Sequence, residues 1–108
     1  MDGREIKKRI MAGEFAANNG KIIRTINILD GDYIDLSTIK MAQPTIDTYA
    51  LNQSIIYLER EGYIKIRDAN TKDSISAELT KIRAAEAVLT AKGIRLAMGY
   101  ETDKAVDI

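Results

Sequence analysis

The sequence predicts a mainly α-helical domain with one small β-hairpin, and three observations lead to this fold class. Its 108 residues are 45% hydrophobic and 30% charged and include one proline, which is typical of a helix-rich globular domain. Apolar residues recur at helical spacing along most of the first 61 positions. After Gly62 the period changes to two, as in a β-strand.

Residues 4–17 form the first predicted helix, because their apolar side chains share one face. That face comprises Ile6, Ile10, Gly13 and Ala17, with Met11 and Phe15 beside it. Residues 18–20 (Asn-Asn-Gly) predict a stop, after which a second helix spans residues 21–29. A brief extended segment at 33–37 and a short helix at 36–42 precede the only proline.

The longest helical signal begins at Asp47, a good N-cap, and ends before Gly62. Its predicted buried stripe is Leu51, Ile55 and Leu58, with Ile46 packing just ahead of the cap. In the following strand Ile64 and Ile66 should face the core, and Lys65 and Arg67 should face solvent.

The last third of the chain predicts a second strand at residues 85–89 and a helix at 91–98, capped by Thr90 and closed by Gly99. Residues 75–83 fit two patterns. Ile75, Ala77 and Leu79 have the spacing of a strand, whereas Ile75, Leu79 and Ile82 have that of a helix. The polar tail at 100–108 is expected to be mobile.

This order of elements is that of a winged helix-turn-helix. Residues 46–64 resemble the recognition helix and wing of small bacterial regulators, and residues 89–94 resemble the strand-to-helix element that closes such domains. The chain is particularly similar to small ArsR-like winged-helix proteins of Mu-like prophages. The resemblance covers about residues 21–99, and implies a winged helix-turn-helix domain there, between an amphipathic helix at 1–20 and a flexible tail at 100–108.

Such a domain reads double-stranded DNA with its second helix, so the resemblance implies a small transcriptional regulator. The face opposite the buried stripe presents Thr48, Tyr49, Asn52, Gln53 and Ile56. Asparagine and glutamine can each form two hydrogen bonds to adenine, and threonine or tyrosine can contact phosphate. On the wing, Lys65, Arg67 and Lys72 are candidates for phosphate contacts. The alternative is that Asn52 and Gln53 are ordinary solvated residues.

Charge favours a second interpretation. Residues 1–24 carry six basic and three acidic residues, and residues 62–95 carry seven basic and four acidic, for a net charge of +3 each. The intervening residues 25–61 carry two basic and six acidic residues, net −4. Because phosphate neutralisation dominates DNA affinity, an acidic recognition unit disfavours tight binding. The alternative function is therefore a protein-interaction module, in phage assembly or DNA packaging, that keeps the winged fold and has a phage or host protein partner.

An enzyme is not expected. The chain contains neither cysteine nor histidine, which excludes thiol and imidazole chemistry and the ligands on which ArsR-family metal sensing relies. No carboxylate pair has a spacing that singles out acid–base catalysis, so we predict no catalytic residue, metal or cofactor. The chain has neither an apolar run of membrane-spanning length nor a signal peptide, which predicts a cytoplasmic protein.

Oligomeric state is the last expectation. The first helix carries a stripe of Ile6, Ile10 and Phe15, which lies outside the minimal winged-helix core and needs cover. Operators read by such domains are commonly two-fold, so these residues form the predicted dimerisation surface. The alternative is a monomer in which this helix folds back on its own core.

Overall fold

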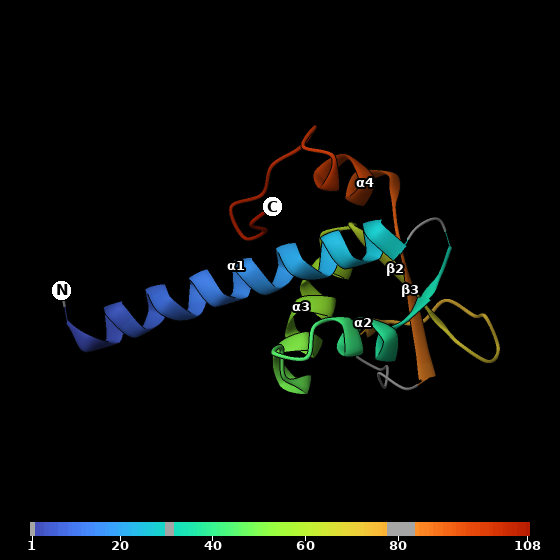
Figure 1. Cartoon of the computed structure of the whole chain (residues 1–108), viewed down its shortest axis with the longest axis horizontal. Helices are drawn as coiled ribbons and strands as arrows, with labels where there is room; N and C mark the ends of the chain where they lie inside the picture. The colour runs from blue at the N-terminus through green and yellow to red at the C-terminus, as the bar shows by residue number, and fades with distance from the viewer. Residues whose placement is uncertain (1, 30–31, 78–83) are drawn as a thin grey trace.

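A computed structural model describes residues 2–29, 32–77 and 84–108, and within them four helices surround a small sheet (Figure 1). The elements are α1 (Gly3–Leu29), β1 (Ile34–Asp35), α2 (Leu36–Ala42), α3 (Thr48–Arg60), β2 (Ile64–Asp68), β3 (Ala85–Leu89) and α4 (Ala91–Ala97). The three strands are antiparallel in the order β1-β3-β2. The predicted class, mainly helical with a small antiparallel sheet, is confirmed at this level.

Helix α1 runs unbroken for 27 residues, so the predicted stop at residues 18–20 is wrong. Asparagine and glycine are poor helix formers, but tertiary contacts override their propensity here. Asn19 is fully buried, and its Nδ2 donates to the Ala105 carbonyl oxygen at 2.8 Å. Gly20 is also buried, directly beneath the backbone of Asp107. The predicted boundary between an amphipathic segment at 1–20 and a separate domain therefore falls inside one helix.

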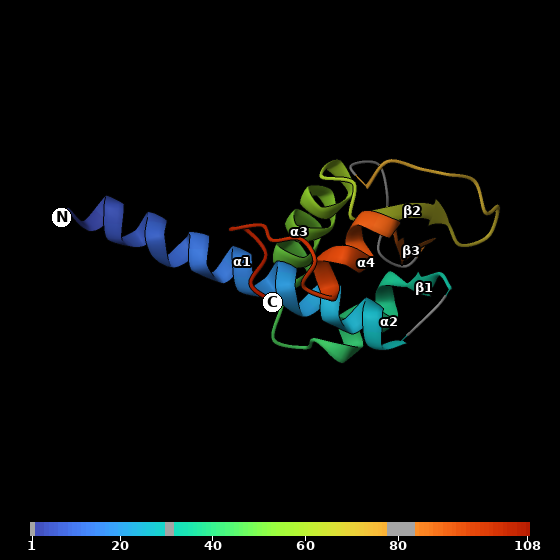
Figure 2. The ribbon, with the colours of Figure 1, turned by 90° about the horizontal axis from the view of Figure 1, so that it is seen from above.

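The two halves of α1 have different surroundings. Ile22, Ile23 and Ile26 in its second half belong to the core, whereas residues 2–14 are all exposed. Both views show the first half extending well beyond the remainder of the molecule (Figures 1 and 2). Although α1 is long, no helix among the described residues is both long and apolar enough to cross a membrane.

Helix α3 forms as predicted. The Asp47 carboxylate accepts a hydrogen bond from the Ala50 backbone N–H at 2.8 Å, as an N-cap should. Leu51, Ile55 and Leu58 are at most 1% exposed, so the predicted stripe is confirmed as the buried face. Gly62 ends the helix region with a φ of 81°, a left-handed conformation that glycine adopts readily.

The two predicted wing strands are also confirmed, as β2 and β3. In their antiparallel register Ile66 pairs with Ala87 toward the core, and Arg67 pairs with Glu86 on the opposite face. Lys65 is exposed as predicted, but Arg67 is only half-exposed and Glu86 is buried. Of the ambiguous segment at 75–83, positions 78–83 lie outside the described residues. Before them, the Ile75 N–H donates to the Ile66 carbonyl at 3.2 Å, so the chain returns beside β2.

The carboxyl-terminal tail packs along α1, contrary to the predicted mobility. The Asp107 N–H donates to the Ala16 carbonyl at 3.0 Å, and the Val106 side chain is buried. This approach requires Gly20, because a Cβ there would lie 1.8 Å from the Asp107 carbonyl oxygen. The tail is polar in composition, so its single buried valine and its backbone contacts gave no sequence signal of docking.

Candidate nucleic-acid interface

The outer face of α3 presents the side chains that were predicted from the sequence to contact DNA bases. Thr48, Tyr49 and Gln53 are exposed, Tyr49 to 75%, whereas Asn52 is half-buried. At 100° per residue, Tyr49 and Gln53 lie nearly opposite the buried stripe, and Thr48 and Asn52 lie to one side of them. Tyr49 and Gln53 are therefore best placed to reach a ligand, and Asn52 is less accessible than predicted.

Two of these side chains also line a groove between α3 and the projecting half of α1. The groove has a volume of about 520 Å³, and its walls include Tyr49, Ala50 and Gln53 from α3 and Met11 and Phe15 from α1. Its lining is mainly apolar. Any macromolecule that approaches this end of α3 therefore encounters α1 as well.

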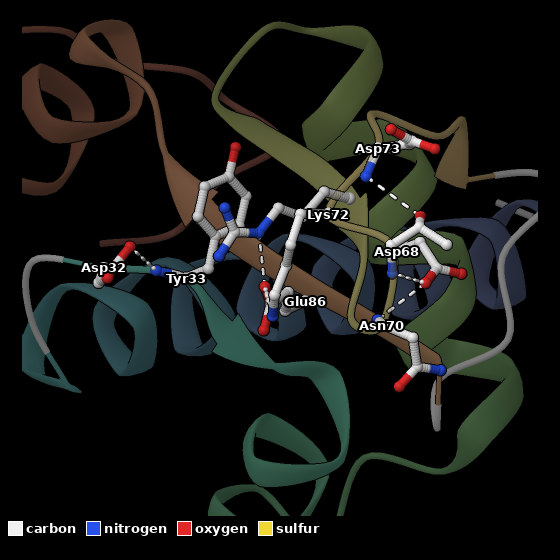
Figure 3. Close-up of polar contacts among 9 residues, drawn as sticks. Asp32, Tyr33, Asp68, Asn70, Lys72, Asp73 and Glu86 are labelled. Carbon is white, nitrogen blue, oxygen red and sulfur yellow. Dashed lines mark hydrogen bonds and ion pairs between the residues drawn. The ribbon is translucent and has the colours of Figure 1, made fainter.

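The predicted wing cations Arg67 and Lys72 are engaged within the chain. Both form ion pairs with the Glu86 carboxylate, which is only 9% exposed, and the Lys72 Nζ lies 3.0 Å from Oε1 (Figure 3). The Arg67 guanidinium also stacks 3.6 Å from the centre of the Tyr33 ring. Hydrogen bonds from Lys72, and then from Arg67, hold the pKa of Glu86 below its usual range. At neutral pH the three groups together carry one net positive charge.

Lys65 has a different environment from the other two wing cations. It is exposed on β2, and among the described residues it has no ion-pair partner. Because its charge is uncompensated, it is the wing residue best suited to a phosphate contact.

The loop after β2 is held by its own polar groups and is tied to α3. The Asp68 carboxylate accepts hydrogen bonds from the Thr71 and Asn70 backbone N–H groups, which lower the pKa of Asp68 (Figure 3). Farther along, the Ala77 N–H donates to the Glu59 carboxylate at 3.1 Å. The wing loop therefore lies beside the carboxyl-terminal half of α3, in contact with the same helix that presents the candidate base-reading residues.

Sequence reasoning missed Glu86 and Tyr33, the partners of Arg67. The register of the hairpin could have identified Glu86, since a residue directly across an antiparallel pair is the natural partner of an outward-facing arginine. That register could not be derived, because the segment between the strands is long and fits two spacings. Nothing in the sequence indicates the stacking of Arg67 on Tyr33.

A second polar cluster was also missed. The hydroxyls of Tyr57 and Tyr63 both donate to one oxygen of Asp103, at 2.7 and 2.8 Å. Burial, and then the bond to Asp103, raises the pKa of each tyrosine. Burial opposes ionisation of Asp103, yet the hydrogen bonds from Tyr57, the Ala105 N–H and Tyr63 lower its pKa overall. Through these hydrogen bonds Asp103, near the beginning of the tail, contacts α3 at Tyr57 and the residue before β2, Tyr63.

The three residues of the predicted dimerisation surface do not share a face. Ile6 and Ile10 are 47% and 57% exposed. Phe15 is half-buried and meets Tyr57 edge to face, with ring centroids 5.2 Å apart. At 100° per residue, Phe15 lies nearly opposite Ile6 on α1. Phe15 therefore belongs to the packing between α1 and α3, while the two isoleucines remain open.

Comparison with protein-family models, curated proteins and solved structures finds no match to this chain. The chemistry of the site therefore follows from its geometry alone. The outer face of α3 offers hydrogen-bonding side chains, and the groove beside α3 offers apolar surface. Among the described residues, the β2–β3 hairpin offers Lys65, which has no ion-pair partner there, and the partly neutralised cluster around Glu86.

Proposed function

We propose that this protein is a winged helix-turn-helix protein that binds double-stranded DNA as a small transcriptional regulator of the prophage type. The observation that carries the proposal is the arrangement around α3. A capped helix with a polar outer face follows a short helix, and an antiparallel hairpin in contact with that helix follows directly after it. The resemblance of residues 46–64 to small bacterial regulators supports the same conclusion.

In this proposal α3 enters the major groove, with Gln53 near the centre of the contact and Asn52 at its side. Either amide can form two hydrogen bonds to adenine. Tyr49 and Thr48, one turn earlier, are close enough to the helix start to contact the flanking phosphates. Lys65 supplies a phosphate contact from the wing.

The charges predict modest affinity. Asp47 is the N-cap of α3 and Glu59 accepts a hydrogen bond from the loop after β2, and both are acidic residues beside the outer face. Arg67 and Lys72 are partly neutralised by Glu86, so the cluster keeps one net positive charge. Few phosphates can therefore be neutralised, and we expect both a weak interaction and a shallow dependence on salt.

Fluorescence anisotropy with labelled duplexes, titrated between about 50 and 200 mM salt, tests this function, since phosphate contacts are salt-dependent in this range. Lys65→Ala should weaken binding to all duplexes alike and reduce the salt slope by about one. Gln53→Ala should weaken binding to a selected site by about 1–3 kcal/mol with little effect on random DNA. Lys104→Ala, an exposed charge on the tail, is the matched control and should change neither value. Absence of binding near 50 mM salt would rule the proposal out.

One observation favours a second candidate, a protein-interaction module. Tyr49 and Gln53 line the apolar groove with α1, and such a groove suits a protein side chain better than a base edge. In that case Tyr49→Ala abolishes capture of a phage or host protein, while every duplex fails to bind.

A further inference from the structure

Helix α1 carries a stripe of residues spaced alternately four and three apart, which keeps them on one side of the helix. The stripe comprises Ile6, Ile10, Gly13, Ala17, Gly20 and Arg24. The tail covers its far end, where the Asp107 carbonyl lies against Gly20 and accepts a hydrogen bond from Arg24 at 3.0 Å. Its near end is open, from Ile6 to Gly13.

The open end lies on the projecting half of α1, which the described chain leaves uncovered. Residues 3–14 are all exposed, although their helix continues without a break from the buried half. A Cβ at Gly13 would meet nothing within 4 Å, so the stripe leaves room there for a neighbouring helix. Along the stripe, two large side chains, Ile6 and Ile10, are followed by two small residues, Gly13 and Ala17, so its two ends differ in side-chain size.

We propose that a second copy of this chain covers the stripe, with the two α1 helices antiparallel about a two-fold axis. The axis passes between Ile10 and Gly13, so that Ile6 of each copy meets Ala17 of the other, and Ile10 meets Gly13. Large side chains then fill the space that small ones leave at each of the four contacts. A two-fold interface requires such self-complementarity, and this stripe has it in its own sequence.

Charge selects the antiparallel direction over the parallel one. Arg4, Lys7, Lys8 and Arg9 crowd the first turns of α1, and a parallel pair would bring the two basic clusters together. The antiparallel pair places them at opposite ends. It also brings Lys7 of each copy near Glu14 of the other, since both lie on the same flank of the stripe. At about 1.5 Å per residue, the helices overlap for about 26 Å between Gly3 and Gly20, and the docked tail flanks the last turn of this overlap, from Ala16 onward.

Sedimentation of the full chain without DNA tests the assembly. We expect a species of about 24 kDa, twice the 12.0 kDa chain, at high micromolar concentration. Ile10→Glu should raise the dimer dissociation constant about 100-fold or more, because both copies lose a burial that accounts for roughly tenfold each. Ile28→Glu is the matched control. Ile28 lies on the same side of α1, five turns farther on, is 76% exposed, and should leave the dimer intact.

Cross-linking tests the direction of the helices. The chain has no cysteine, so introduced cysteines are unique. With a short bis-maleimide, a mixture of Ile6→Cys and Ala17→Cys chains should form the mixed cross-linked dimer, while Ile6→Cys alone should not cross-link. Cross-linking of Ile6→Cys with itself would indicate a parallel pair and overturn the proposal.

A monomer that persists at high micromolar concentration also overturns it, as does a dimer that survives Ile10→Glu but is lost on Tyr49→Ala, which would place the contact in the groove. The proposal does not rest on DNA binding. Dimer formation and DNA binding are measured separately, so the failure of one proposal can be distinguished from the failure of the other.

Discussion

Gly20→Ala is the substitution whose effect depends most directly on the docked tail. In an ordinary helix interior, replacing glycine by alanine stabilises by about 0.5–1 kcal/mol. At this position the new Cβ would lie 1.8 Å from the Asp107 carbonyl oxygen and 2.6 Å from its carbonyl carbon. Both atoms are backbone, so no side-chain rotation relieves the clash, and the end of the tail must leave α1.

The magnitude follows from what the tail loses. Burial of Val106 contributes about 1.5–3 kcal/mol, and each of three hydrogen bonds to α1 contributes about 0.5–1.5 kcal/mol. Ordering Val106 and Asp107 costs about 1–2 kcal/mol for each residue, which offsets about half of this gain. A net docking free energy on the order of 2 kcal/mol remains. After the helical gain, Gly20→Ala should lower the free energy of unfolding by about 1–2 kcal/mol.

Urea denaturation followed by circular dichroism measures this change, and carboxypeptidase digestion reports on the tail independently. Gly13→Ala is the control, compared at concentrations at which the chain is monomeric, because a Cβ at Gly13 meets nothing within 4 Å in one chain and should stabilise the helix. If Gly20→Ala proved as stable as Gly13→Ala and its tail resisted digestion, the close approach of Asp107 to α1 would be wrong.

Three further predictions concern the core, the polar cluster and the second close glycine. Leu58→Ala should lower the free energy of unfolding by about 2–5 kcal/mol, while Asn52→Ala should change it by less than about 1 kcal/mol, both measured by urea denaturation. Because the pKa of Asp103 is lower in the folded chain than unfolded, its ionisation stabilises the fold above the ordinary carboxyl pKa, and this contribution is lost as the pH falls through the lowered value. Asp103→Asn should therefore be less stable than the parent at pH 7 by about 2–3 kcal/mol in thermal unfolding, and the two should converge as the pH falls below the lowered pKa of Asp103. Gly93→Ala should lower the melting temperature, since its Cβ would lie 2.0 Å from the Tyr63 carbonyl oxygen; an unchanged melting temperature would contradict the packing of α4 on the backbone of Tyr63, just before β2.

Local signals account for the parts of the fold that the sequence predicted well. The signals for α3 lie close together in the chain: the Asp47 cap, the stripe from Leu51 to Leu58, and Gly62. The helix and its buried face could therefore be predicted from the sequence alone. The unbroken α1 could not, because the contact that stabilises helix at Asn19 comes from a residue 86 positions away. Propensity is a weak guide where such distant contacts decide the outcome.

In the candidate site, too, features set by local sequence could be predicted, and features set by distant contacts could not. Exposure of Tyr49 and Gln53 follows from helical geometry once the buried stripe of α3 is known. The ion pairing of Arg67 does not follow in this way, because it depends on the register of β2 and β3 across a long connection that fits two spacings in the sequence. The sequence therefore indicated which side chains face outward, but not which of the outward charges are already compensated.

The continuity of α1 also determines how its exposed half can form. Beginning a helix is costly, since several backbone dihedrals are fixed before the first hydrogen bond, whereas each added residue then brings its own bond. In this chain the buried half, around Ile22 and Ile26, serves as the nucleus, and residues 3–14 need only be added to it one at a time. The projecting half is therefore helical because it extends a helix that the core stabilises. Its helical structure should fray progressively from Gly3 and should not melt as a separate unit.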